Sequence, residues 1–199
     1  KTFLALATIM LAIGINAQTI VTRDNITEAD IDKMAGSLYQ YLPPTEPLTP
    51  APKGFKPVYL THYGRHGSRY LDNASNYDRP YNILKTADDA DQLTEFGKDV
   101  LRRVALIREG AARRAGDLSN KGKQQHIGIA HRMVENYPEL FTKDKTVVAK
   151  STTSYRVLVS EYSALMEILR MRPYMKFDYD SSNFDEPYMY TEDRAAGSL

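Results

Sequence analysis

The strongest constraint on the fold is the order in which helical and strand-like patterns follow one another. Apolar residues recur at helical spacing in residues 93–116, and further helices are expected from about 119 to 137 and from about 154 to 171. Short runs rich in β-branched and aromatic residues, at 55–62 and 146–149, predict strands. The order strand, helix, helix, strand, helix favours a three-layer α/β fold over an all-helical one.

The first residues have the pattern of an export signal. KTFLALATIMLAIGINAQ begins with a basic residue, continues as an apolar run to about Ile15 and offers a cleavage site after Ala17. The run is shorter than the about 20 apolar residues that a membrane-spanning helix needs. We therefore expect residues 1–17 to be a signal peptide, the protein to be periplasmic or secreted, and no stable membrane anchor to persist after cleavage.

The rest of the chain is expected to have two parts. Residues 18–54 should contain a helix that ends near Gly36 and an extended, polyproline-like arm with five prolines between 43 and 54. Residues 55–199 should form the α/β domain, with a helical insertion at about 71–116. The net charge of +1 provides no overall field for nucleic acid, so no nucleic-acid partner is expected and any anion site must be a local cluster. Because the chain has no cysteine, disulfides and thiolate sites are excluded.

Residues 60–73, LTHYGRHGSRYLDN, gather cations and glycines around a histidine just after the first predicted strand. The carboxyl ends of strands are where open α/β sheets bind ligands. Arg65 and Arg69 can bracket an oxyanion beside His66, since guanidinium groups form paired hydrogen bonds with phosphate oxygens. Their charge also disfavours imidazolium, which lowers the pKa of His66 and keeps the ring a neutral nucleophile.

Other interpretations of these residues stay open at this point. His66 can be an ordinary surface or hydrogen-bonded histidine, and Ser68 is a weaker candidate nucleophile because it lacks an adjacent base other than His66. His62 and His66 have the spacing of a zinc-binding pair on a helix, but the glycines around them disfavour a helix and no third ligand is evident. His126 and His131 are five residues apart on a predicted helix and share no face, and His131 is expected to be structural.

Three stretches of the sequence resemble one known family. YGRHGSR resembles the RHGxR signature of the histidine acid phosphatases, the second branch of the histidine phosphatase superfamily. GDLSNKGKQQHIGIAHR resembles the family's G-[DE]-L-T-x-x-G-x-x-Q segment, with Ser119 in place of Thr. VVAKSTTSYRVLVSEYSAL resembles the family's S-T-x-x-x-R-x-x-x-S-A pattern, which here supplies Ser151, Thr152, Arg156, Ser160 and, with a shift, Ser163-Ala164. The matches extend from about residue 55 to 172, and HYGRHGSRY is most similar to the multiple inositol polyphosphate phosphatases, which act on phytate.

The resemblance implies a phosphoglycerate-mutase-like α/β/α fold, here incomplete at its carboxyl end, and hydrolysis of phosphomonoesters such as inositol polyphosphates. His66 would be the nucleophile and form a phosphohistidine, while Arg65, Arg69 and Arg156 would bind the transferred phosphate. No metal or cofactor is implied, because arginines neutralise the phosphate charge. Further cations are expected to serve a substrate with many phosphates, with Lys53, Lys56, Arg79 and Arg103 as candidates.

The sequence also departs from the family pattern. Leu71 stands where the family usually has proline, and none of the four histidines is followed by the Asp or Ala-Glu of the family's proton-donor motif. We therefore expect an amino-terminal piece of a longer enzyme whose proton donor lies elsewhere. The alternative is a non-catalytic exported relative that binds phosphates. Phosphoglycerate-mutase-like chemistry is disfavoured by the exported start and by the RHGxR pattern.

Overall fold

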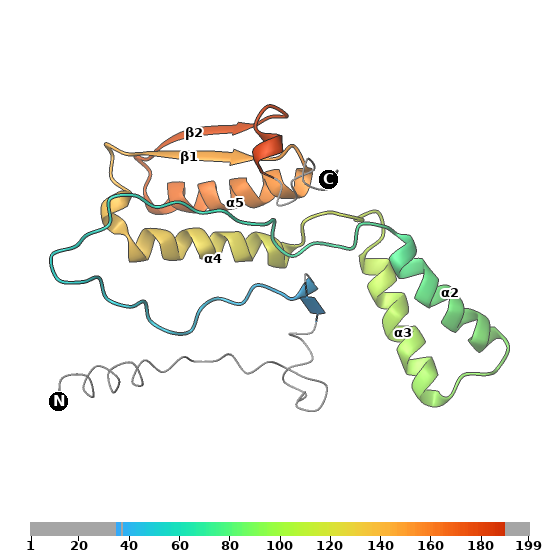
Figure 1. The fold of residues 1–199 in the computed structure, drawn as a ribbon. Coiled ribbons are helices and arrows are strands. Elements are labelled where there is room, and N and C mark those ends of the chain that lie inside the picture. Colours follow the sequence, from blue (N-terminus) through green and yellow to red (C-terminus); the bar gives the residue numbers. More distant parts are fainter. Residues whose placement is uncertain (1–34, 37, 190–199) are drawn as a thin grey trace, which may run out of the picture. The chain divides into compact units, whose positions relative to one another are not determined.

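The computed structural model describes residues 35–36 and 38–189 (Figure 1). The signal peptide expected at residues 1–17, and nearly all of the helix expected before Gly36, lie outside the described residues. The chain divides into two units, Lys1–Gln40 and Tyr41–Leu199. Every helix and strand discussed below belongs to the second unit.

Two long helices, α4 (Asn120–Asn136) and α5 (Tyr155–Met171), pack against each other and form most of the core (Figure 1). Both confirm the helices that the sequence predicts at about 119–137 and 154–171. Ser119 caps α4, because its hydroxyl accepts a hydrogen bond from the backbone N–H of Gly122 at 3.1 Å. The buried apolar cluster comes from these helices and the segments that follow each of them: Ala130, Val134, Phe141, Ile168 and Met175.

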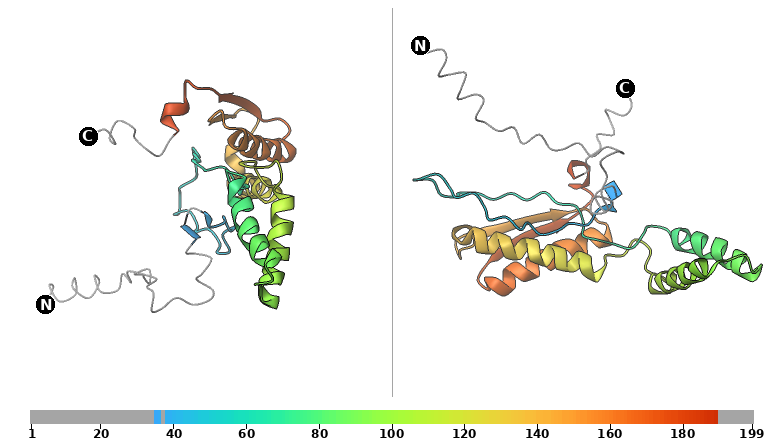
Figure 2. Two further views of the ribbon diagram at one scale, coloured as in Figure 1. Left: turned by 90° about the vertical axis from the view of Figure 1, so that its right-hand side faces the viewer. Right: turned by 90° about the horizontal axis from the view of Figure 1, so that it is seen from below.

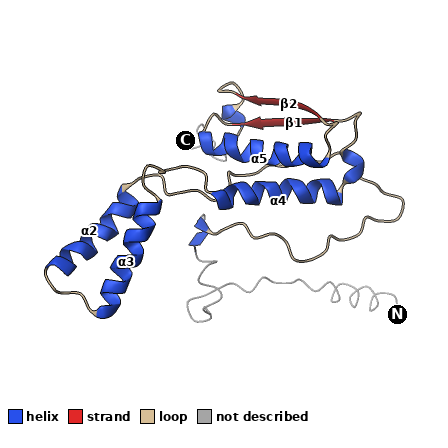
Figure 3. Ribbon diagram, turned by 180° about the vertical axis from the view of Figure 1, so that it is seen from behind, coloured by secondary structure: helices blue, strands red, loops and turns tan. Residues whose placement is uncertain are grey.

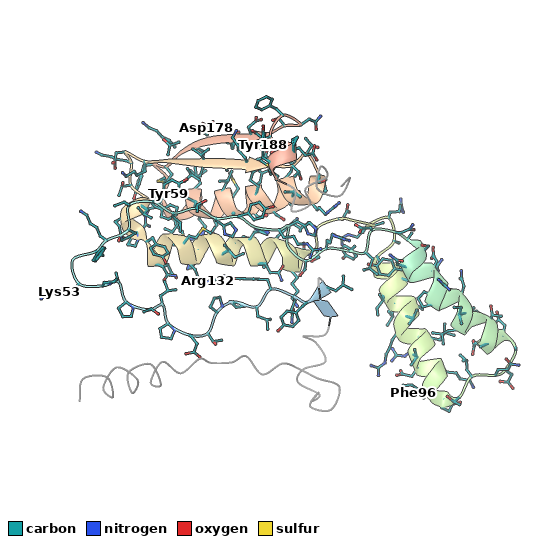
Figure 4. The ribbon with its side chains drawn as sticks, in the orientation of Figure 1. Lys53, Tyr59, Phe96, Arg132, Asp178 and Tyr188 are labelled. Carbon is teal, nitrogen blue, oxygen red and sulfur yellow. The ribbon has the colours of Figure 1, made fainter. Side chains whose placement is uncertain are left out.

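The strands β1 (Thr146–Ser151) and β2 (Lys176–Ser181) are parallel and pair residue for residue along their whole length. Since α5 connects them, the three elements form a βαβ unit, and the protein mixes helix and strand as expected. Val147 and Phe177 pack against the core, while Asp178 is on the exposed side of its strand (Figure 4). Two short 3-10 helices, η3 (Pro138–Leu140) and η4 (Glu186–Tyr188), precede β1 and follow β2.

The strand predicted at residues 55–62 is wrong. The segment forms neither helix nor strand and is drawn as a loop in Figure 3. Its apolar side chains are largely exposed, 80% for both Val58 and Tyr59. A strand persists where its backbone N–H and C=O groups are paired by a neighbouring strand. Within the part of the chain that the structure describes, no strand pairs with this segment, so its β-branched and aromatic composition is not sufficient.

The strand β2 was not predicted from the sequence. Asp178 and Asp180 occupy alternate positions of this strand, and Asp is depleted in strands, which weakened the signal. The recognisable part of the pattern is the alternation of Phe177 and Tyr179 with these carboxylates. Its place after a strand and a helix is also where a βαβ unit returns to the sheet.

The helices α2 (Ser75–Asp89) and α3 (Glu95–Gly110) lie side by side (Figures 1 and 2). The α3 helix confirms the periodicity found in residues 93–116, and the Thr94 hydroxyl caps it by accepting from the Gly97 N–H at 3.2 Å. Neither helix contains a fully buried residue, and Phe96 is 78% exposed (Figure 4). The apolar stripe of α3 is thus partly covered, because Val100, Leu101 and Val104 are partly buried whereas Phe96 and Ile107 are exposed.

Backbone pairing joins the two ends of the segment that contains α2 and α3. Residues 68–71 and 116–119 run antiparallel, and we call this pairing the seam. Three hydrogen bonds of 2.9 Å form it, from the N–H groups of Tyr70, Gly116 and Ser119 to the carbonyls of Asp117, Leu71 and Ser68. Gly116 has a φ of +76°, a conformation that favours glycine.

The proline-rich arm forms no helix or strand over residues 43–54, as its prolines predict. Tyr41, which precedes the arm, is bonded to α4. The Tyr41 hydroxyl accepts a hydrogen bond from Arg132 at 2.7 Å, and the Tyr41 carbonyl accepts one from the Gln125 side chain at 3.2 Å. Among the described residues, no helix combines the length and the apolar character needed to cross a bilayer.

Candidate active site

His66 is half-buried in the loop between the extended segment and the seam. Its Nδ1 lies 2.8 Å from the backbone carbonyl of Gly67. A carbonyl oxygen can only accept, so Nδ1 donates and carries the proton of the neutral ring. The lone pair of the neutral imidazole is therefore on Nε2, which is the atom left for attack on an electrophile.

The surroundings of His66 favour its neutral form. Burial is the largest cause of a lowered pKa for His66, and the nearby charges of Arg65, Arg156 and Arg69 lower it further, against the opposing effect of the Gly67 hydrogen bond. From the sequence, the arginines alone were expected to lower the pKa of His66, whereas in the structure burial contributes more. All three arginines predicted to bind phosphate lie close enough to act on the ring, although Arg156 is far from His66 in the sequence.

Two of these arginines have donors that are buried without a hydrogen bond. The Nε–H groups of Arg69 and Arg156 find no partner within the described part of the chain. An unpaired buried donor costs about 1–3 kcal/mol, and more when the group is charged. An oxyanion placed between these guanidinium groups would satisfy both N–H groups with charge-assisted hydrogen bonds. Arg156 also lies in the first turn of α5, where the backbone N–H groups favour an anion.

The α4 helix holds the loop that carries His66 by direct backbone contact. A Cβ added to Gly67 would lie 2.4 Å from the Gly122 carbonyl oxygen, and a Cβ added to Gly122 would lie 2.3 Å from the Ser68 carbonyl oxygen. Both positions therefore need glycine for close approach. Polar groups of α4 and its cap complete the attachment: Ser68 N–H donates to Gln125 Oε1 at 2.8 Å, and the Ser119 hydroxyl donates to the Ser68 carbonyl at 2.7 Å.

The α5 helix fixes the same loop from another side. The buried hydroxyl of Ser160 accepts a hydrogen bond from the Gly67 N–H at 3.1 Å and donates to the Arg156 carbonyl at 2.8 Å. Ser160 thus links the backbone of Gly67, next to His66, with the backbone of Arg156. Ser160 belongs to the family-like pattern of this segment, but the sequence alone indicates no role for it.

Two further histidines belong to the neighbourhood of His66. Burial lowers the pKa of His62, and burial is also the largest cause of the lowered pKa of His126, to which His62 and His66 contribute. His126 donates from Nε2 to the Arg65 carbonyl at 3.2 Å, so it supports the loop, a role that sequence analysis missed. His131 is ion-paired with Glu167. In residues 35–36 and 38–189, no group of three or more His, Cys, Asp or Glu side chains is arranged to hold a metal ion.

A cavity of about 400 Å³ opens beside His66. The extended segment, α4, β1 and α5 all contribute to its wall, which includes His62, His126 and Glu161. Glu161 accepts hydrogen bonds from Ser151 at 2.9 Å and from Ser181 at 3.2 Å, which tie α5 to the last residues of both strands. Burial raises the pKa of the Glu161 carboxyl above its ordinary value.

Like Arg69 and Arg156, the cations proposed to bind additional phosphates lie outside the wall of this cavity. Arg103 is paired with Asp99 on α3 through a 2.7 Å hydrogen bond. None of the four candidates contributes to the wall of the cavity beside His66: Lys53, Lys56, Arg79 and Arg103.

Comparison with protein-family models finds no match for this sequence, and no curated protein matches it significantly.

Proposed function

We propose that this chain is the phosphoryl-transfer part of a phosphomonoester hydrolase, that His66 is its nucleophile and that inositol polyphosphates are its substrate class. The fold that we propose for the complete domain is the three-layer, phosphoglycerate-mutase-like α/β/α arrangement. The observation that carries the proposal is an imidazole that is bonded through Nδ1 to the Gly67 carbonyl, has a lowered pKa and lies beside three arginines, two of which have unpaired buried Nε–H groups. The substrate class rests on the resemblance of the residues around His66.

The reaction has two displacements at phosphorus. The Nε2 lone pair attacks the phosphorus atom, the N–P bond forms, and the ester P–O bond breaks as the alcohol leaves with a proton from a general acid. Water then attacks the phosphohistidine and gives a proton to the conjugate base of the general acid, the N–P bond breaks, and inorganic phosphate and neutral imidazole are released. Arg65, Arg69 and Arg156 stabilise the charge on the oxygens of the transferred group. No step needs a metal ion or a cofactor.

The general acid is not among the residues assigned here. None of the four histidines is followed by Asp or by Ala-Glu. This observation favours one alternative function, which is binding of phosphorylated ligands without catalysis. The two functions differ in a measurable way, because a binder takes up inositol hexakisphosphate saturably and releases no phosphate from it.

A trapping experiment tests the nucleophile separately from the general acid. An aryl phosphate with a strongly acidic phenol as leaving group needs no protonation of the leaving oxygen. We expect the chain, mixed with such a phosphate carrying a radioactive label and quenched in alkaline detergent, to retain label on His66. His66→Asn should abolish the label, and His131→Asn, which removes an ion-paired histidine outside the cavity, should retain it. Labelling of His66→Asn at the wild-type level would show that another residue is the nucleophile.

A further inference from the structure

Asp72 follows the loop that carries His66 and is bonded to one of the candidate phosphate ligands. Arg69 donates from Nη2 to Asp72 Oδ2 at 2.7 Å and from Nη1 to the Tyr70 carbonyl at 2.8 Å. The Arg69 side chain is 17% exposed, and its buried Nε–H has no partner in the described part of the chain. Both terminal nitrogens are therefore held by the protein, while the Nε–H is left for a ligand.

The second oxygen of Asp72 and another candidate phosphate ligand, Arg156, both lie near Gly116. A Cβ added to Gly116 would be 3.8 Å from Asp72 Oδ1 and 4.0 Å from Arg156 Nη1. The two atoms thus border the same space, which stays open because position 116 has no side chain. Two guanidinium groups that converge on one phosphate repel each other when the phosphate is absent, and a carboxylate bonded to one of them reduces that repulsion.

We propose that Asp72 is a positioning residue of the phosphate site: it orients Arg69 so that the Nε–H faces the phosphate, and it allows Arg156 to approach the same space. The inference rests on the proposed function, because it concerns the same phosphate. Asp72 itself does not touch the substrate. Its hydrogen bond to Nη2 leaves the donor that the phosphate uses unoccupied.

Asp72 could also have the opposite effect, which is to weaken phosphate binding by electrostatic repulsion. A carboxylate near a phosphate site repels the phosphate, so its removal would tighten binding if repulsion dominated. The Asp72 side chain is 61% exposed, and water and salt screen its charge at a distance. Its 2.7 Å hydrogen bond to Arg69 acts at contact and is weakened much less by screening. Orientation of Arg69 should therefore outweigh repulsion, and the two effects predict opposite signs.

The test is the affinity of the full chain for inorganic phosphate, measured by calorimetry for the wild type and for Asp72→Asn, Asp72→Ala and Asp72→Glu. We expect Asp72→Asn and Asp72→Ala to bind about fivefold more weakly, which corresponds to roughly 1 kcal/mol for an exposed pair. Asp72→Glu, which keeps the charge, should recover part of the affinity. In nitrogen-15 NMR spectra, phosphate should shift the Arg69 Nε–H resonance in the wild type and shift it less in Asp72→Asn.

Asp89→Asn is the matched control, because Asp89 pairs with Lys85 on α2 and its side chain is 63% exposed. It should leave phosphate affinity unchanged. If Asp72→Asn binds phosphate as tightly as the wild type, or more tightly, the role of Asp72 is overturned while the proposed function stands. If the wild-type chain binds neither inorganic phosphate nor inositol hexakisphosphate, the proposed function fails and this inference fails with it.

Discussion

Replacing Gly122 by alanine tests the contact that holds the His66 loop on α4. The new Cβ would lie 2.3 Å from the carbonyl oxygen of Ser68 and 2.8 Å from its backbone nitrogen. Because these are backbone atoms, rotation of a side chain cannot relieve the overlap. The loop must withdraw by about 1 Å to restore ordinary van der Waals contact.

The cost of that withdrawal can be worked out from the bonds it disturbs. Ser68 is bonded to Gln125 at 2.8 Å and to the Ser119 hydroxyl at 2.7 Å, and each bond contributes about 1 kcal/mol. Overpacking adds about 1–3 kcal/mol, and the helix propensity of alanine returns at most about 1 kcal/mol. We expect Gly122→Ala to lower the free energy of unfolding by about 2–4 kcal/mol. Phosphate affinity should also fall, because displacement of the loop moves His66 relative to the arginines that bind phosphate.

Gly128→Ala provides the control on the same helix. A Cβ at Gly128 meets only Arg132 Nη1, at 3.2 Å, which is the end of a flexible side chain. This variant should be stabilised by up to about 1 kcal/mol. Urea denaturation followed by circular dichroism measures both changes, and calorimetry with inorganic phosphate measures the site. Equal stability and equal phosphate affinity in the two variants would refute the argument that backbone contact at Gly122 positions His66.

Two further predictions concern α5. Ser160→Ala leaves the buried Gly67 N–H without its acceptor and should cost about 1–3 kcal/mol in urea denaturation. Ser163→Ala, whose hydroxyl bonds only the Val159 carbonyl of its own helix, is the control, and an equal loss in both would contradict the role of Ser160. Burial raises the pKa of Glu161 above its ordinary value of 4.5. The stability that the protonated Glu161 carboxyl contributes is therefore present in full at pH values below its pKa in the unfolded protein. This stability is lost as the pH rises through its higher pKa in the folded protein. Raising the pH above 4.5 should lower the Tm of the wild type more than that of Glu161→Gln, and parallel curves would speak against this.

Local patterns predicted the helices well and the strands poorly. The Ser119 cap and the apolar spacing of α4 and α5 lie within a few residues of each other in sequence, so the helix signal is complete in a short window. A strand depends on a neighbour that the window does not contain. The extended segment at 55–62 has the composition of a strand but no strand partner among the described residues, whereas β2 has two carboxylates and is paired along its whole length with β1.

The candidate site divides in the same way. The first part of the site lies within five consecutive residues, from Arg65 through His66 to Arg69. It could therefore be recognised from composition and charge alone. Arg156 was assigned only through a family resemblance, because nothing in its own surroundings indicates a partner so distant in sequence. The support from Gln125 was missed for the same reason. Gly122 is the exception, because glycine is unfavourable in a helix. Its presence in the first turn of α4 indicates that a close contact there requires it.

The seam holds the two ends of the α2–α3 hairpin side by side. Because the chain is already closed there by backbone hydrogen bonds, the segment between its two sides can grow, shrink or change its surface without rerouting the residues on either flank. Lengthening a segment whose two ends are paired costs little conformational entropy, because the entropy of loop closure grows only slowly with the number of residues. The hairpin is thus a place where evolution, or a protein engineer, can exchange whole helices while the histidine and its arginines keep their geometry.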